Sequence, residues 1–103
     1  MSKERRLELQ AILINLLGSK NVYFQPPSSV KMQYPAIIYE RGTIETLFAN
    51  NRLYQNVDRY TVTIIDANPD SDIPDKVLRL PLCRFDRHYT AENLNHDVFN
   101  VYY

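Results

Sequence analysis

Hydrophobic and polar residues alternate most regularly near the middle of the chain, in residues 58–66. Tyr60, Val62 and Ile64 are separated there by single polar residues, which is the period of a β-strand with one apolar face. The run is rich in β-branched and aromatic side chains and contains neither glycine nor proline. We therefore predict that residues 58–66 form the central strand of a small sheet.

A second pattern, with helical spacing, occupies residues 3–17. Its apolar residues recur at intervals of three and four positions and form one stripe along a helix. The members of this stripe are Leu9, Ile12, Leu13, Leu16 and Leu17. Gly18 follows directly and is a natural helix stop. The sequence therefore predicts an N-terminal helix that packs on Val62 and Ile64 of the central strand.

The remaining elements follow from shorter patterns that proline and turn residues separate. They are a brief edge pairing at 22–24, an interior strand at 36–41, a short helix at 73–80, and strands at 82–89 and 96–103 joined by a turn at 90–95. The predicted fold class is α+β, with a mostly antiparallel sheet of about four to five strands, an N-terminal helix and a second short helix. The expected order of elements is α-β-β-β-α-β-β.

Simple alternation also assigns faces within the strand predicted at 82–89. It places Phe85 and Tyr89 on one side of the sheet. Arg84, Asp86 and His88 then lie on the other side.

Residues 42–57 carry many apolar side chains for a loop exposed to solvent. Asn50 and Asn51 tolerate the positive φ of a tight turn, so a hairpin or β-arm is expected around 42–57 within a single domain spanning residues 1–103. One interpretation is an ordinary meander that joins two sheet strands. The other is a projecting arm that packs on a neighbouring copy. The second interpretation makes subunit-interface candidates of Ile44, Leu47, Phe48, Asn50, Asn51, Leu53 and Tyr54.

Charge and cysteine content narrow the functional classes. Twelve Lys and Arg residues balance twelve Asp and Glu residues, which argues against non-specific binding to nucleic acid or membranes. The single cysteine, Cys83, cannot form an internal disulfide and fits a reducing compartment. The charged N-terminal segment and the polar interruptions after it predict neither a signal peptide nor a membrane span.

Candidate chemistry is sparse. The two glycines cannot build a phosphate-cradling loop. Asp86, His88, His96 and Cys83 match no metal-ligand spacing, and Cys83 is better explained as a small buried hydrophobic residue than as a nucleophile. We therefore expect no catalytic residue, no cofactor and no metal, and we predict that the protein is not an enzyme.

Several short runs follow one another in a distinctive order along the chain. They are the leading amphipathic helix, residues 34–39, residues 48–51 with Tyr54, residues 59–66, residues 69–71, residues 87–89 and residues 93–97. Taken together and in this order, the runs resemble the tail terminator proteins of long-tailed (siphovirus-type) bacteriophages, within the class of small tail-completion or head-tail joining proteins. The resemblance covers nearly the whole chain and depends on order and pattern more than on one diagnostic motif.

This resemblance implies a structural virion protein whose α+β subunits assemble as a homo-oligomeric, hexameric ring on the tail tube. Such a ring caps the tube, stops its polymerisation and joins the tail to the head connector. The implied partners are the tail tube protein and the connector (stopper) protein. DNA passes through the channel without sequence-specific binding, and no membrane is involved. The implied location is the head-proximal end of the tail in the virion, after assembly in the host bacterial cytoplasm.

Two alternatives stay open at this stage. One is another position in the same particle, as a stopper or adaptor ring of the head-tail connector or as a minor capsid protein. The other is a small intracellular binding domain, which salt-sensitive DNA binding by the isolated chain would support.

Overall fold

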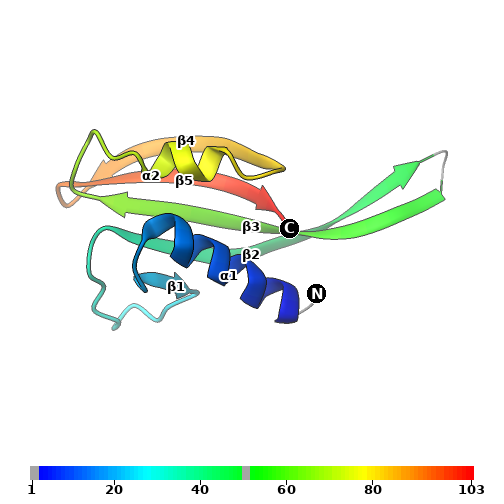
Figure 1. Ribbon diagram of the computed structural model, residues 1–103, viewed down its shortest axis with the longest axis horizontal. Helices are drawn as coiled ribbons and strands as arrows, with labels where there is room; N and C mark the ends of the chain where they lie inside the picture. The colour runs from blue at the N-terminus through cyan, green and yellow to red at the C-terminus, as the bar shows by residue number, and fades with distance from the viewer. Residues whose placement is uncertain (1–2, 50–51) are drawn as a thin grey trace.

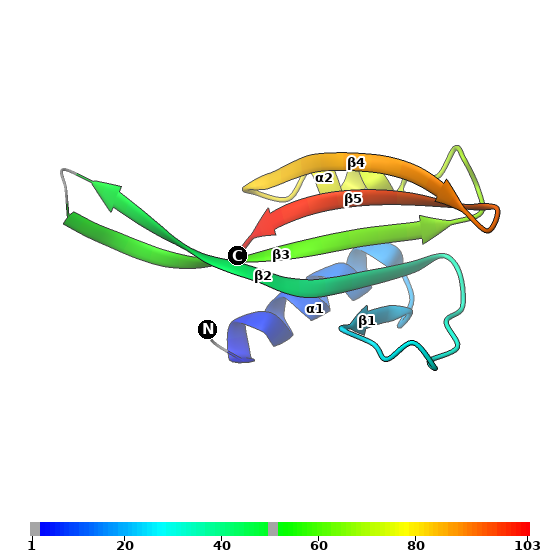
Figure 2. The ribbon, with the colours of Figure 1, turned by 180° about the vertical axis from the view of Figure 1, so that it is seen from behind.

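A computed structural model describes residues 3–49 and 52–103, of which residues 43–49 and 52–58 are described by their backbone alone. Two helices lie on one face of a five-stranded sheet, and the other face has no helix among the described residues (Figures 1 and 2). The strands follow the order β1-β2-β3-β5-β4 across the sheet. The elements are α1 (Lys3–Leu17), β1 (Val22–Phe24), β2 (Ala36–Ala49), β3 (Arg52–Asp66), α2 (Ile73–Leu78), β4 (Cys83–Ala91) and β5 (Leu94–Tyr102).

The predicted fold class and element order are confirmed. All strand pairs are antiparallel except β1 with β2, which is parallel and joins Val22 to Ile37 and Phe24 to Tyr39. β1 is the short edge strand expected from the sequence, and α1 occupies the predicted residues 3–17. The strand predicted at 58–66 is the inner half of β3, which pairs with both β2 and β5.

The core lies between the helices and the sheet. Tyr60, Val62 and Ile64 of β3 are completely buried, as expected from the alternation in the sequence. They join one apolar cluster with Leu9 and Leu13 of α1. The cluster continues through Ile37, Tyr39, Ile73, Val77, Phe99 and Val101. The helices are therefore held to the sheet by burial of one face of the three inner strands.

A β-bulge in β4 makes the face assignment of that strand wrong. The register changes between Phe85, which pairs with Phe99, and Arg87, which pairs with Val98. Phe85 shares the helix-covered face with Phe99, and the two rings meet edge to face at 5.5 Å. Tyr89 lies opposite His96 and on the other face of the sheet. The extra residue, Asp86, breaks the period of two that the prediction assumed.

The turn between the last two strands is shorter than the predicted 90–95 segment. β4 continues to Ala91 and β5 begins at Leu94, so only Glu92 and Asn93 form the connection. Both residues have positive φ, of 53° and 64°, as a two-residue hairpin turn of the primed type requires. The polar composition of the segment suggested a loop, but cross-strand pairing extends both strands through it.

The outer halves of β2 and β3 extend beyond the rest of the sheet. β1 pairs with β2 only at residues 37–39, and β5 pairs with β3 only from Arg59 to Asp66. Beyond those limits β2 and β3 pair with each other, up to Ala49 opposite Arg52. This two-stranded extension, here called the arm (residues 42–57), leaves one end of the body in Figures 1 and 2. It accounts for the elongated dimensions of 48 × 24 × 23 Å.

A second bulge marks the base of the arm. Arg41 pairs with Tyr60 and Ile44 pairs with Asp58, so Gly42 and Thr43 together oppose the single residue Arg59. A Cβ atom on Gly42 would lie 3.0 Å from the backbone oxygen of Arg59 and 3.0 Å from its Nε. The absence of a side chain at Gly42 therefore permits the close approach of β3 at this point.

We expect Ile64→Ala to lower the free energy of unfolding by roughly 2–5 kcal/mol, because it removes buried methyl groups and leaves a cavity. Chemical denaturation of the purified chain measures the change. Thr90→Ala, at an exposed position of β4, is the matched control and should alter stability by less than about 0.5 kcal/mol. An Ile64→Ala variant as stable as the wild type would contradict the assignment of the core.

Gly42→Ala should loosen the base of the arm, since overpacking against a backbone atom typically costs about 1–3 kcal/mol. Backbone amides of the arm should then exchange with solvent roughly tenfold faster or more, which hydrogen exchange measures. Gly18→Ala is the control: Gly18 has a φ of 80°, and a Cβ added there would meet no atom within 4 Å, so the cost of the change is local to the end of α1. Equal arm exchange in wild type and Gly42→Ala would contradict the tight contact.

Candidate functional site

The predicted interface residues fall on the arm. Ile44, Leu47 and Phe48 lie on β2, and their backbones pair with Asp58, Gln55 and Leu53 of β3. Leu53 and Tyr54 lie on the returning strand, where a further register change leaves Tyr54 as an extra residue. Asn50 and Asn51 lie outside the described residues. Of the described candidates, Phe48 and Leu53 therefore lie directly opposite each other across the two strands.

Two features of the backbone bear on the meander and arm interpretations of residues 42–57. β2 and β3 are consecutive strands of one sheet, as in a meander. Their outer ends also pass beyond the body, where neither helix lies in Figure 1 or Figure 2. The candidate apolar residues thus belong to a part of β2 and β3 whose backbone extends past the two helices and the other described strands.

The body offers a separate exposed surface along β4, the edge strand opposite β1. Every residue of β4 after Cys83 is exposed. Large apolar side chains are included: Leu82 just before the strand is 62% exposed, Phe85 is 51% exposed and Tyr89 is 42% exposed. We call residues 82–91 the β4 edge. An apolar edge strand of this length is a surface on which another chain can dock.

A groove adjoins the β4 edge on the sheet face away from the helices. Its volume is about 380 Å³, and the exposed rings of Tyr34 and Tyr89 border it. Ile38, Ile65 and Leu94 contribute apolar surface, and Tyr89 stacks on His96 with ring centroids 4.5 Å apart. The uncovered sheet face is therefore hollowed and apolar beside its exposed edge.

The histidines and acidic residues considered as ligands have local roles. His88 Nε2 lies 3.3 Å from Asn95 Oδ1, and His96 Nδ1 lies 3.1 Å from the carbonyl oxygen of Leu94. Asp86 forms an ion pair with Arg87 at 2.7 Å on the exposed strand. Within residues 3–49 and 52–103, no group of three or more His, Cys, Asp or Glu side chains is placed to hold a metal ion.

Cys83 is half-buried and packs against the core cluster. Burial raises the pKa of its thiol, so less of it is ionised at neutral pH. At neutral pH the group therefore supplies less of the thiolate, which is the form that acts as a nucleophile and as a metal ligand. Its environment therefore gives it a packing role.

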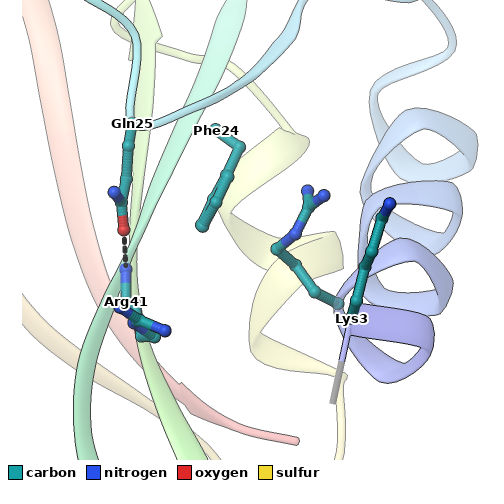
Figure 3. Close-up of a pocket in the computed structure, with 5 residues that line it drawn as sticks. Lys3, Phe24, Gln25 and Arg41 are labelled. Atoms are coloured by element: carbon teal, nitrogen blue, oxygen red, sulfur yellow. Dashed lines mark hydrogen bonds between the residues drawn. The ribbon is translucent and has the colours of Figure 1, made fainter. Parts of the chain in front are cut away.

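Sequence reasoning missed a hollow between α1 and the β1–β2 edge. Lys3, Arg6 and Arg41 line it together with Phe24 and Gln25 (Figure 3). The spacing of Lys3 and Arg6 on one helix face was a detectable signal. The contribution of Arg41 was not detectable, because it depends on the packing of β2 beside α1, where Arg6 donates a hydrogen bond to the hydroxyl of Tyr39.

Taken together, the described residues form an α+β fold with a two-stranded arm at one end and an exposed apolar edge on its body. No protein-family model and no curated protein sequence matches the chain. None of the described helices combines the length and the apolar character needed to cross a membrane.

If Asp86, His88, His96 and Cys83 bind no structural metal, a chelator should leave the melting temperature of the chain unchanged, since no coordinated ion would stabilise the folded form. Thermal melts with and without chelator measure this. A drop of several degrees that added zinc reverses would contradict our interpretation of these four residues.

Proposed function

We propose that the chain is a tail terminator subunit of a long-tailed bacteriophage. In this proposal, copies form a homo-oligomeric ring, of six subunits by the resemblance described above, that caps the tail tube, stops its polymerisation and joins the tail to the head connector. The observation that carries the proposal is the arm, in which β2 and β3 continue past the body and pair only with each other among the described strands.

The physical argument begins with the apolar content of the arm. Ile44, Leu47, Phe48, Leu53 and Tyr54 lie on backbone beyond the helix-covered part of the sheet. An isolated two-stranded hairpin is at best marginally stable in water. Packing the arm on a neighbouring subunit would contribute about 0.8 kcal/mol for each methylene buried, which offsets the entropy of ordering it.

The position of the exposed surfaces favours a ring over a symmetric dimer. The arm leaves one end of the body, whereas the β4 edge runs along its side (Figure 1). A contact between two different patches is heterologous, and repeating it around a closed axis generates a ring. Leu82, Phe85 and Tyr89 of the β4 edge supply exposed apolar surface that such a contact would bury.

The remaining parts of the proposal follow from the same role. The partners would be the tail tube protein below the ring and the connector (stopper) protein above it. DNA would pass through the channel without sequence-specific contacts, which the balanced charge of the chain suits. The protein would be a structural component without enzymatic activity, assembled in the host bacterial cytoplasm and located at the head-proximal end of the tail.

The double substitution Leu47→Asp with Phe48→Asp should abolish ring formation and infectious particles, because two charges would be buried in the subunit contact. The melting temperature of the isolated subunit should change little, since the backbone of the arm extends beyond the part of the sheet that the helices cover. Complementation of particles that lack the wild-type chain measures assembly, and a thermal melt measures subunit stability.

The matched control is Leu7→Asp with Leu78→Asp, which adds the same charge at two exposed leucines of the helix layer. The control should support normal assembly. Normal assembly by the Leu47→Asp and Phe48→Asp variant would refute the arm contact. Equal loss of subunit stability and assembly in that variant would show that the arm belongs to the subunit's own core.

A further inference from the structure

The groove on the uncovered sheet face lies at the end of the body opposite the arm. Its lining residues come from the segment before β2, from the adjoining ends of β2 and β3, and from the β4–β5 hairpin. In Figures 1 and 2 the turn of that hairpin and the start of β2 lie at one end of the molecule, and the arm leaves the other end. A contact between the arm of one copy and the groove of another would therefore join two different surfaces.

The walls of the groove are held in place by contacts within the fold. On the β4 side, the ring of Tyr89 stacks on His96 with an angle of 12° between the ring planes. On the β2 side, the segment that carries Tyr34 is tied to β1, because the backbone N–H of Gln33 donates to the hydroxyl of Tyr23 at 3.4 Å. The walls therefore need little reorganisation to receive an occupant, which lowers the cost of binding.

The charge of the groove indicates the kind of occupant. Among the described residues that line it, Glu92 is the only charged one, with histidine counted as neutral. Glu92 is exposed at the β4–β5 turn, and none of the residues that the structure describes forms an ion pair with it. An apolar groove with this single carboxylate suits an apolar segment that carries one positive charge.

The arm has that composition. Residues 46–57 contain one charged residue, Arg52, among apolar ones such as Phe48 and Leu53. The backbones of Phe48 and Leu53 pair across the two strands, and Arg52 pairs with Ala49 at the outer end of the described arm. The positive residue is therefore the direct neighbour of the apolar pair in the backbone register.

The length of the arm matches the width of the body. Residues 42–49 of β2 span roughly 25 Å at the usual rise of a strand, and the two shorter dimensions of the molecule are 24 × 23 Å. An arm of this length can cross the sheet face of a neighbouring copy and reach the groove. Because the groove opens on that face, successive copies are turned relative to one another, as closure into a ring requires.

We propose that the groove receives the arm of the next copy of this chain, with Arg52 of one copy facing Glu92 of the other. This inference rests on the proposed function, because it identifies the acceptor surface within the proposed ring. The groove adjoins the β4 edge and shares Tyr89 with it, so one contact covers both surfaces. Apolar residues of the arm would be removed from water against Ile38 and Leu94.

Exchange of the two charges tests the contact. Arg52→Glu and Glu92→Arg should each weaken self-association of the purified chain by at least about tenfold, because each places like charges together. Sedimentation over a range of concentrations measures association, and a thermal melt checks the fold of each variant. An equimolar mixture of the two variants should assemble as the wild type does, because every arm then finds a groove of opposite charge on the other variant.

The matched controls are Arg79→Glu and Asp75→Arg, which make the same two exchanges at exposed positions of the helix layer. Each control should associate as the wild type does. Equal weakening in the controls and in the arm and groove variants would show general repulsion between charges and would overturn the assigned pair.

Three further results would overturn the proposal. The first is a wild-type chain that stays monomeric at about millimolar concentration. The second is normal association of both single variants, or an equimolar mixture that fails to assemble. The third is loss of infectious particles in the Glu92→Arg variant with unchanged self-association, which would assign the groove to a different virion protein.

Failure of this contact and failure of the proposed function give different results. Normal association of both exchange variants, together with over-long, headless tails from particles that lack the chain, would reject the contact and retain the terminator. Rescue by the mixture, together with normal tails from particles that lack the chain, would retain the contact and reject the terminator.

Discussion

The antiparallel pairing of β2 with β3 is the interaction on which the rest of the molecule depends. Its inner half carries Tyr39, Val62 and Ile64 into the core, where the two helices cover them. Its outer half continues as the arm, from the bulge at Gly42 to the pairing of Ala49 with Arg52. One ladder of backbone hydrogen bonds therefore fixes both the core and the surface proposed for assembly. Loss of register at the bulge would affect the arm without removing the buried half of the pairing.

The fold follows from the sequence where the hydrophobic period is long and uninterrupted. Tyr60, Val62 and Ile64 alternate through the centre of β3, and the stripe of α1 includes Leu9 and Leu13, so both elements were predicted with the correct buried faces. The short run at 22–24 was also placed correctly at a sheet edge, although its parallel direction was not predicted. The predictions for these elements were correct because local pattern and tertiary packing favour the same structure.

The errors arise where one residue changes the register. The bulge at Asp86 moves Tyr89 to the face opposite Phe85, and no local pattern in residues 82–89 signals that insertion. For residues 42–57, the surplus of apolar residues left two interpretations open, an ordinary meander and a projecting arm. The hollow between α1 and the β1–β2 edge was not anticipated, because Arg6, Gln25 and Arg41 are distant in the sequence and line it only through the packing of α1 beside β1 and β2. Sites built from three separate segments depend on long-range contacts that spacing alone does not encode.

The central claim of a tail-terminating ring is tested most directly by electron microscopy of particles made without this chain. Negative staining of lysates from a deletion strain shows both the length of the tails and whether they carry heads. Our account predicts over-long tails that lack heads, because nothing would stop the tube or provide a surface for the connector. Tails of normal length joined to filled heads would contradict it. Heads that leak DNA beside complete tails would instead indicate a stopper or adaptor ring.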